Sequence, residues 1–422
     1  PGDHNERLTV DELRAVFLFD GRARSFICSS VCHQACCSPC RRRVSPSLVR
    51  MIYAASFVLI LMLIVVFSSR FVGGWASVLG KRVHLPPLDG QVYIVTGGSR
   101  GVGWQVCVRY AEVGAWGSQH CYDLSISYQV AARLVEAGAT VVITSRSSAE
   151  AAARAIGSSR VVSMTLDLES FGSIRSFTDE CLRRFGRLDG LVLNGGIAKS
   201  FLDSNSFGVT AHGFESMIGV NYLGNVQVCE LLLPLLRATP GARVVAMTST
   251  AAANSYPCGI DYGSWRHRTL EYTDWAAYGQ SKLALALYVK GLQKREPFVL
   301  ALACHPGVAS TGLTEHRGRW LDAVYAAFVY GVLGMRLEKM ALSPLYCLVT
   351  EGLTPGGVYH PVGRSGFLTH WYQRMGALQT PVPVTIDHPD LWGRTQDALR
   401  EAEALNPPAG RSTSKPLRQK TC

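Results

Sequence analysis

The sequence lacks the residue spacings that indicate a metal centre or a disulfide framework. Of its 13 cysteines, five lie in residues 1–50 and eight are scattered over the rest of the chain. The first five fit no zinc pattern with paired histidines, so palmitoylation or an artefact explains them better. The other eight are typical of reduced thiols in a domain that faces the cytosol. We therefore expect no bound metal.

Acidic residues are also scarce, and the formal net charge is +11. Residues 1–50 contribute +3 of this excess and the tail 409–422 contributes +4, so the remainder of the chain is only modestly basic. Such a distribution does not indicate a nucleic-acid surface. A phosphate-bearing cofactor and an anionic membrane surface are sufficient to account for it.

Charged residues are absent from residues 51–69, which form one apolar run. A helix of that length spans about 28 Å, close to the roughly 30 Å hydrocarbon core of a bilayer. We therefore expect a transmembrane anchor. A cleaved signal peptide is the alternative, but the run is longer than a usual signal and no small-x-small cleavage site clearly follows it.

The orientation of this span depends on residues 1–50, which precede the first methionine, Met51. We expect them to be translated leader or part of an incomplete gene model. Without them, the nearby basic residues lie at 70–82, after the span, and favour a cytosolic domain on a membrane such as the endoplasmic reticulum. The arginines at 41–43 and at 50 would instead favour the lumen.

A glycine-rich turn follows a strand-like run at 91–96. Gly97, Gly101 and Gly103 permit a tight turn, and they allow backbone N–H groups to approach a phosphate at the start of a helix. The spacing differs from the G-x-G-x-x-G fingerprint, and alone it would also fit a turn that binds nothing.

Tyr278 and Lys282 are four residues apart, so on a helix they share one face. An ammonium fixed beside a phenol lowers the pKa of the tyrosine from about 10, which lets it exchange protons near neutral pH. The pair alone is also common on solvated helices. Its weight comes from the motifs that accompany it.

Further segments, in a matching order, resemble the short-chain dehydrogenase/reductase family. They are Asn194-Gly195-Gly196 after an apolar run, Asn221 in a Gly-Val-Asn-Tyr-Leu-Gly segment, Ser249 at the end of another apolar run, and His305-Pro306-Gly307-Val308 followed by Thr311. The resemblance spans roughly residues 88–392. Within the family it is greatest to retinol-dehydrogenase-type and related lipid or steroid oxidoreductases.

The resemblance implies roles for four catalytic residues. Tyr278 would be the general acid and base, and Lys282 would lower its pKa and bind the nicotinamide ribose. Ser249 would donate a hydrogen bond to the developing oxyanion, and Asn221 would hold a water in the proton relay. Cofactor contacts are implied for Thr96, Gly97, Ser99, Arg100, Gly101, Val102, Gly103, Arg146, Asp167, Asn194, Gly195, Tyr278, Lys282, Pro306, Gly307, Val308 and Thr311.

Charge after the second predicted strand bears on the cofactor. No carboxylate follows Arg146 until Glu150, and Arg100 adds a second cation in the glycine loop. Two arginines suit a ribose 2′-phosphate, so we expect NADP(H) rather than NAD(H). A solvated Arg146 is the alternative. Asp167 matches the family residue that contacts adenine, although alone it would read as a helix cap.

Strand-like runs alternate with helix-like segments, which predicts an α/β fold with a Rossmann-type doubly wound parallel sheet over residues 88–395. The cofactor crevice would lie at the carboxyl ends of the strands. A disordered tail is expected over 396–422. The predicted strands are 91–96, 139–145, 160–166, 188–194, 242–248, 298–304 and 356–360.

Residues 106–129 interrupt this pattern. Their removal would join Gln105 to Val130 in one helix, and it would shorten the interval from Gly103 to Arg146 from 43 to 19 positions. About 20 positions separate the glycine loop from the ribose-reading residue in such folds. We interpret the segment as an unspliced intron or a similar gene-model artefact. The alternative is a genuine surface loop at the mouth of the cofactor site.

Residues 313–347 are apolar and aromatic. They indicate a lid over a hydrophobic substrate or a helix at the membrane interface, or else packing of a C-terminal extension. We expect a membrane-anchored oxidoreductase that transfers a hydride between NADP(H) and a retinoid, steroid or other lipid-like alcohol or carbonyl. A catalytically silent dinucleotide-binding or scaffold protein is the alternative. Expected partners are the substrate, the membrane and, as an option, a second copy of the chain.

Overall fold

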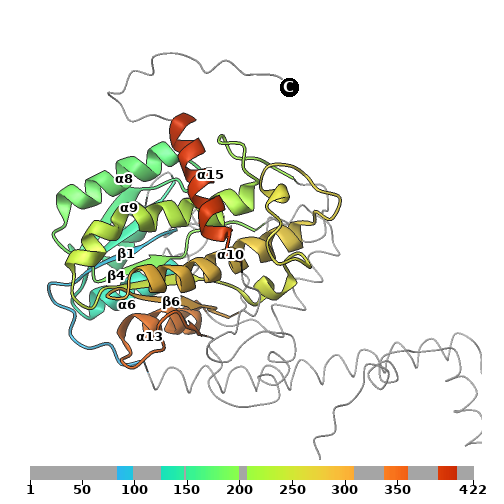
Figure 1. The fold of residues 1–422 in the computed structure, drawn as a ribbon. Helices are drawn as coiled ribbons and strands as arrows, with labels where there is room; N and C mark the ends of the chain where they lie inside the picture. The colour runs from blue at the N-terminus through green and yellow to red at the C-terminus, as the bar shows by residue number, and fades with distance from the viewer. Residues whose placement is uncertain are drawn as a thin grey trace, which may run out of the picture. The chain divides into compact units, whose positions relative to one another are not determined.

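The computed structural model describes residues 83–97, 125–146, 149–198, 207–307, 337–359 and 388–405. All of them lie in one compact unit, Met62–Cys422. Within these residues seven parallel strands form one sheet in the order β3-β2-β1-β4-β5-β6-β7 (Figure 1). The strands are β1 (Val92–Val95), β2 (Thr140–Ser145), β3 (Val161–Thr165), β4 (Gly190–Leu193), β5 (Arg243–Met247), β6 (Leu300–Cys304) and β7 (Val358–Tyr359).

Each strand lies inside one of the predicted runs, and the doubly wound parallel sheet is confirmed. The strand order reverses between β1 and β4, which pair directly through Tyr93 and Gly190. In such sheets a ligand crevice opens at this reversal, at the carboxyl ends of the strands.

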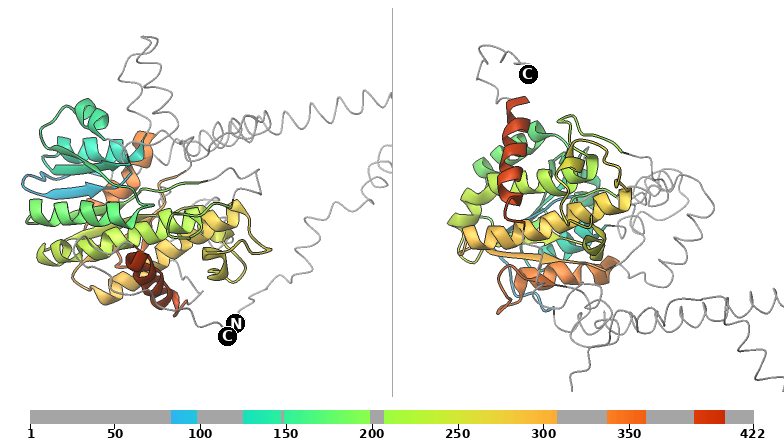
Figure 2. Two further views of the ribbon diagram at one scale, coloured as in Figure 1. Left: turned by 90° about the horizontal axis from the view of Figure 1, so that it is seen from above. Right: turned by 45° about the vertical axis from the view of Figure 1, so that its right-hand side comes forward.

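Helices cover both faces of the sheet (Figure 2). One face packs against α8, α9, α10 and α15, and the other packs against α6, α7 and α13. The elements are α6 (Ile126–Glu136), α7 (Glu150–Ile156), α8 (Phe171–Arg184), the π-helix η1 (Ile218–Gly224), α9 (Asn225–Ala238), the 3₁₀ helices η2 (Thr250–Asn254) and η3 (Gly263–Trp265), α10 (Asp274–Arg295), α12 (Leu337–Met340), α13 (Leu342–Val349) and α15 (Leu391–Leu405).

Two hydrophobic cores result from the alternation of side chains along each strand. On β1, Ile94 enters the core beneath α8, α9 and α10, whereas Tyr93 and Val95 enter the core beneath α6 and α13. Because both faces are buried along the central strands β1, β4, β5 and β6, these strands are nearly continuous apolar runs, and this is why the sequence predicted them well.

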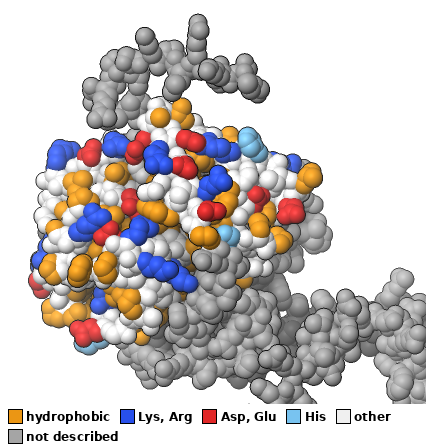
Figure 3. Space-filling view, in the orientation of Figure 1, with side chains coloured by type: hydrophobic (Ala, Val, Ile, Leu, Met, Phe, Trp, Pro, Cys, Tyr) orange, Lys and Arg blue, Asp and Glu red, His pale blue; other side chains and the backbone are white. Residues whose placement is uncertain are grey.

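The predicted tail is wrong at its start, because α15 continues to Leu405. Leu399 and Ala402 are buried in the larger core, and Thr395 shares a 2.7 Å hydrogen bond with Tyr222 of η1. Ion pairs from Glu403 and Glu401 add to this docking, among basic and acidic side chains that intermingle on this face (Figure 3). Burial of its apolar side therefore orders a segment that composition alone marked as polar.

Of the predicted insertion, the structure describes only the last five residues, 125–129. Helix α6 begins at Ile126, four residues before Val130, so the last residues of 106–129 form its first turn. Ser127 and Gln129 in that turn are buried. Residues 106–124 of the insertion lie outside the described residues, and its origin stays a prediction.

The predicted leader 1–50 and the apolar run 51–69 also lie outside the described residues. Among the helices that the structure describes, none has the length and apolar character needed to span a bilayer. For the region 313–347, the described part belongs to α12 and α13. There Leu345 and Cys347 pack beneath the sheet. Residues 313–336 lie outside the described residues, so the choice among a lid, an interfacial helix and a packed extension stays a prediction.

Candidate active site

Lys282 projects from α10 toward the ends of β4 and β5. Its side chain is 6% exposed, and its Nζ donates a 2.9 Å hydrogen bond to the carbonyl of Met247, the last residue of β5. The Nζ lies 5.9 Å from the centre of the Tyr278 ring. A Cβ added to Gly196 would stand 3.5 Å from this Nζ, so the glycine after β4 leaves the ammonium accessible from that side.

Tyr278 is 8% exposed and lies in a small hydrophobic cluster of its own. The cluster joins Met217 before η1, Ala251 of η2 and Ala277 of α10. The indole of Trp275 stacks against the phenol ring at 6.4 Å. Three elements therefore fix the ring of the proposed acid and base.

Asn221 lies fully buried in η1, the π-helix that precedes α9. Its Oδ1 accepts from the N–H of Ile197 at 2.7 Å, and its Nδ2 donates to the carbonyl of Ile197 and to Ser281 Oγ. A π-helix is uncommon and frequently marks a functional site. Here it connects the loop after β4 to the residue beside Lys282.

Ser249 follows β5 and caps η2, where its Oγ accepts from the N–H of Ala251 at 3.2 Å. The hydroxyl proton therefore remains to be donated elsewhere. Helix α10 approaches η2 closely at Gly279, where a Cβ would lie 2.6 Å from the carbonyl oxygen of Ala251. This contact packs η2, which Ser249 caps, against the turn of α10 that carries Tyr278.

Burial lowers the pKa of Lys282 from 10.5 to about 8. An unfolded chain holds this proton up to a higher pH than the folded chain does. Between pH 8 and 10.5 the unfolded state therefore binds more protons, so the free energy of unfolding should rise with pH. The lysine site contributes about 3 kcal/mol to this rise at most.

We expect the free energy of unfolding of a Lys282→Met variant to lack this rise between pH 8 and 10.5. The free energy of unfolding of the parent minus that of the variant should be smallest below pH 8 and should increase by about 2–3 kcal/mol toward pH 10.5. Urea denaturation without cofactor, repeated across this range, measures this difference. A difference that stays constant with pH would contradict a buried lysine with a lowered pKa.

The ends of β1 and β4 form a tight backbone junction. Thr96 Oγ1 accepts from the N–H groups of both Asn194 and Gly195 at 3.0 Å. Gly97 has a φ of 81°, and a Cβ on it would stand 2.7 Å from the Cα of Gly195. No other residue fits this approach, so backbone alone faces the crevice at this point.

Two residues of this junction were missed by sequence reasoning. Ser127 Oγ lies within hydrogen-bond distance of the carbonyls of Thr96 and Gly97 and accepts from Asn194 Nδ2. Asn225 Nδ2 donates to the carbonyl of Gly195 at 2.8 Å. The placement of Ser127 inside the predicted insertion concealed it. The four-residue spacing of Asn225 from Asn221 was the available signal.

The positions of Arg146 and Asp167 are compatible with both interpretations of the sequence, namely a cofactor contact and an ordinary local role. The Arg146 guanidinium is 3.6 Å from the carboxylate of Glu169, and its side chain is 40% exposed. Asp167 Oδ1 accepts from the N–H of Glu169, which is the local turn role that the residue would play without a ligand. Both lie after neighbouring strands, β2 and β3, at the predicted crevice edge.

The remaining predicted contacts divide into two groups. Pro306 and Gly307 follow β6, and Gly307 has a φ of 112°. The others lie outside the described residues: Ser99, Arg100, Gly101, Val102, Gly103, Val308 and Thr311.

Comparison with known proteins gives consistent matches. A family model described as enoyl-(acyl carrier protein) reductase matches residues 122–290. The chain is 32% identical to retinol dehydrogenase 13 of Mus musculus over 272 residues, which cover 63% of this chain and 73% of that protein. It is 34% identical to polyprenol dehydrogenase of Mus musculus over 284 residues, covering 65% and 76%. It is 29% identical to dehydrogenase/reductase SDR family member 13 of Bos taurus over 293 residues, covering 67% and 70%.

Proposed function

Because this chain belongs to the short-chain dehydrogenase/reductase family, in its retinol-dehydrogenase-like group, we propose that it transfers a hydride between NADP(H) and a hydrophobic alcohol or carbonyl compound. Family membership makes it an NAD(P)-dependent oxidoreductase that acts on CH–OH groups. Two relatives are named for retinol and polyprenol, which are both long apolar alcohols. Their names support a retinoid, steroid or other lipid-like substrate.

The single observation that carries the catalytic proposal is the placement of Lys282. Its ammonium is buried beside the Tyr278 ring and donates a hydrogen bond to the carbonyl of Met247. Asn221 donates to Ser281, the residue before Lys282. A buried cation at this distance stabilises a phenolate, as a general base requires.

The residues at the crevice fit a dinucleotide, because Gly97, Gly195 and Gly196 leave no room for a Cβ and so expose backbone. The strand-end residues would hold it, and when bound it supplies the hydride. In carbonyl reduction Tyr278 would donate its proton to the substrate oxygen, and Ser249 would donate a hydrogen bond to the same oxygen. Asn221 would hold a water that returns a proton toward Lys282.

The test is turnover by the purified full-length chain. NADPH and NADH oxidation should be measured against retinoid, steroid and aliphatic carbonyl compounds at neutral pH. We expect turnover with apolar carbonyls and NADPH. Preference for small hydrophilic carbonyls would contradict the substrate class, and cofactor binding without any turnover would favour the silent alternative.

Arg146 supports the choice of NADP(H), and Arg146→Ala tests it. Loss of one charged contact to a 2′-phosphate costs about 1.5 kcal/mol, so we expect KM for NADPH to rise about tenfold while KM for NADH changes little. Arg133→Ala, which removes an exposed arginine paired with Glu136 on α6, is the matched control. Equal changes for both cofactors would show that Arg146 does not read the phosphate.

We also propose that residues 51–69 anchor the enzyme in the endoplasmic reticulum membrane with its catalytic domain in the cytosol. The uncharged run of that length and the basic residues at 70–82 support this arrangement. Protease digestion of sealed microsomes should remove the catalytic domain. Protection of the domain until detergent is added would place it in the lumen.

A further inference from the structure

A buried carboxylate closes the start of the helix that carries Asn221. Glu215 is 1% exposed, and its Oε2 accepts from the N–H groups of Met217 at 3.0 Å and Ile218 at 2.9 Å. Such N–H groups at a helix start have no partner within the helix. Glu215 therefore fixes the first turn of η1, and Asn221 lies three residues after Ile218, the first residue of this helix.

The hydroxyl of Tyr272 connects this carboxylate to the start of α10. It lies 3.3 Å from Glu215 Oε1 and 3.0 Å from Asp274 Oδ1. Asp274 is the first residue of α10, which presents Tyr278 one turn later and Lys282 two turns later. One phenol thus contacts both the carboxylate that caps η1 and the first residue of α10, the two helices that supply the proposed proton relay.

Tyr272 remains a hydrogen-bond donor in this position. Burial, followed by the charges of Glu215 and Asp274, raises the pKa of Tyr272 far above 10. A phenol carries a single proton, so it donates to one carboxylate at a time, and both oxygen–oxygen distances are within range.

The ring of Tyr272 packs where the catalytic tyrosine packs. Tyr272 is 4% exposed and belongs to the small cluster that contains Met217, Ala277 and Tyr278. Phe207 meets its ring edge-on, with the centroids 5.0 Å apart. The ring of Tyr272 therefore packs beside Tyr278, while its hydroxyl contacts Glu215 and Asp274.

We propose that Tyr272 is a positioning residue that holds the first turns of η1 and α10 together, and thereby fixes Tyr278 relative to Asn221. Tyr272 acts through these residues rather than on the substrate. The inference rests on the proposed function for its catalytic consequence, and on geometry alone for the link between the helices.

Tyr272→Phe tests the link, because it removes the hydroxyl and leaves the ring in the cluster. We expect kcat to fall about tenfold, since small errors of orientation at a reacting centre are costly. KM for the carbonyl and Kd for NADPH should stay within about twofold, because these contacts are untouched. Amide hydrogen exchange should become faster in both 215–221 and 274–282.

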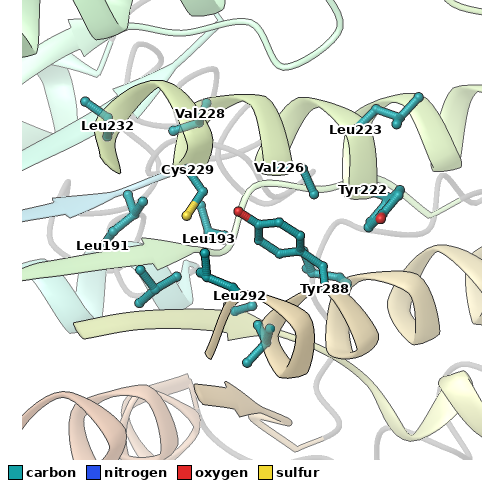
Figure 4. Close-up of a cluster of buried hydrophobic side chains, with 14 of the residues drawn as sticks. Leu191, Leu193, Tyr222, Leu223, Val226, Val228, Cys229, Leu232, Tyr288 and Leu292 are labelled. Carbon is teal, nitrogen blue, oxygen red and sulfur yellow. The ribbon is translucent and has the colours of Figure 1, made fainter. Parts of the chain in front are cut away.

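Tyr288→Phe is the matched control. Tyr288 is 3% exposed, and its hydroxyl donates to Glu230 Oε1 at 2.7 Å, so it also joins α10 to the α9 side (Figure 4). It lies six residues beyond Lys282 and belongs to the large core. We expect this variant to lose similar stability while kcat and the exchange of the two helix starts stay unchanged.

The outcomes separate the two proposals. An active parent with an unchanged kcat in Tyr272→Phe, or equal kcat losses in the two variants, would overturn the positioning role. A parent without turnover would refute the proposed function. Hydrogen exchange would then still decide whether Tyr272 joins the helices, and unchanged exchange at both helix starts would overturn that link too.

Discussion

Tyr278→Phe is expected to lower kcat by about a thousandfold while leaving the fold and cofactor affinity intact. The substitution removes one oxygen and its proton, and positioned proton transfer contributes about 10²–10⁴ to rate. The ring contacts with Trp275 and the small cluster persist, because they do not involve the hydroxyl. Steady-state NADPH oxidation with an apolar carbonyl measures the loss.

A second tyrosine controls for the general cost of losing a phenol hydroxyl. Tyr93 is 3% exposed on β1, and its hydroxyl donates to Gln91 at 2.6 Å, before the strand begins. It thus lies near the amino-terminal end of β1, away from the predicted crevice at the carboxyl ends of the strands. Tyr93→Phe should retain activity. If Tyr278→Phe turns over substrate as fast as this control does, Tyr278 is not the proton donor.

Binding should distinguish a chemical loss from a misfolded site. NADPH affinity, measured by fluorescence titration, should change less than about twofold in Tyr278→Phe, because a loss confined to kcat marks an interaction made in the transition state. A loss of cofactor affinity as large as the loss of kcat would instead limit Tyr278 to its expected contact with the cofactor. The mechanism proposed for Ser249 and Lys282 would then need another proton donor.

The sheet was predictable because its central strands are short apolar runs buried on both faces, whereas the edge strand β3 is only partly buried. In β5, Val244 and Val245 enter different cores, and neither needs a particular partner to be recognised as a strand. The tail was less predictable. Helix α15 is amphipathic, and its order depends on Tyr222 and on other residues more than a hundred positions away.

The candidate site shows the same division. Tyr278, Lys282, Asn221 and Ser249 were predicted because their motif order resembles a known family, and the structure brings them around the ends of β4 and β5. Nothing in the local sequence shows that Asn221 lies in a π-helix, since one shifted hydrogen bond separates that helix from an ordinary one. The contacts of Asn221 with Ile197 and Ser281, 24 and 60 positions away, likewise form only when the chain is folded.

Charge patterns were informative only in part. In the sequence, no carboxylate lies between β2 and Glu150. In the structure, however, the carboxylate of Glu169, which follows β3, lies 3.6 Å from the guanidinium of Arg146. An exposed pair of this kind contributes little stability and is easily rearranged. A 2′-phosphate bound as proposed would compete with Glu169 for the arginine, and the linear sequence did not reveal this pairing.

Gly279→Ala is expected to lower the free energy of unfolding by about 2 kcal/mol although it improves helix propensity. Alanine gains about 1 kcal/mol over glycine inside a helix. The new Cβ would lie 2.6 Å from the carbonyl oxygen of Ala251 and 2.9 Å from backbone atoms of Asn254 and Ser255. Backbone cannot turn aside as a flexible side chain can, so overpacking of about 3 kcal/mol should outweigh the gain.

Gly291→Ala on the same helix isolates this steric cost. Its Cβ would meet only the end of the Arg295 side chain, at 3.6 Å, so the variant should be as stable as the parent or up to about 1 kcal/mol more stable. Urea denaturation compares the two. Gly279→Ala should also lose activity, because displacement of η2 moves Ser249 away from Tyr278. Equal stability of both alanine variants would mean that α10 and η2 are not in close contact, and the placement of Ser249 beside Tyr278 would fail with it.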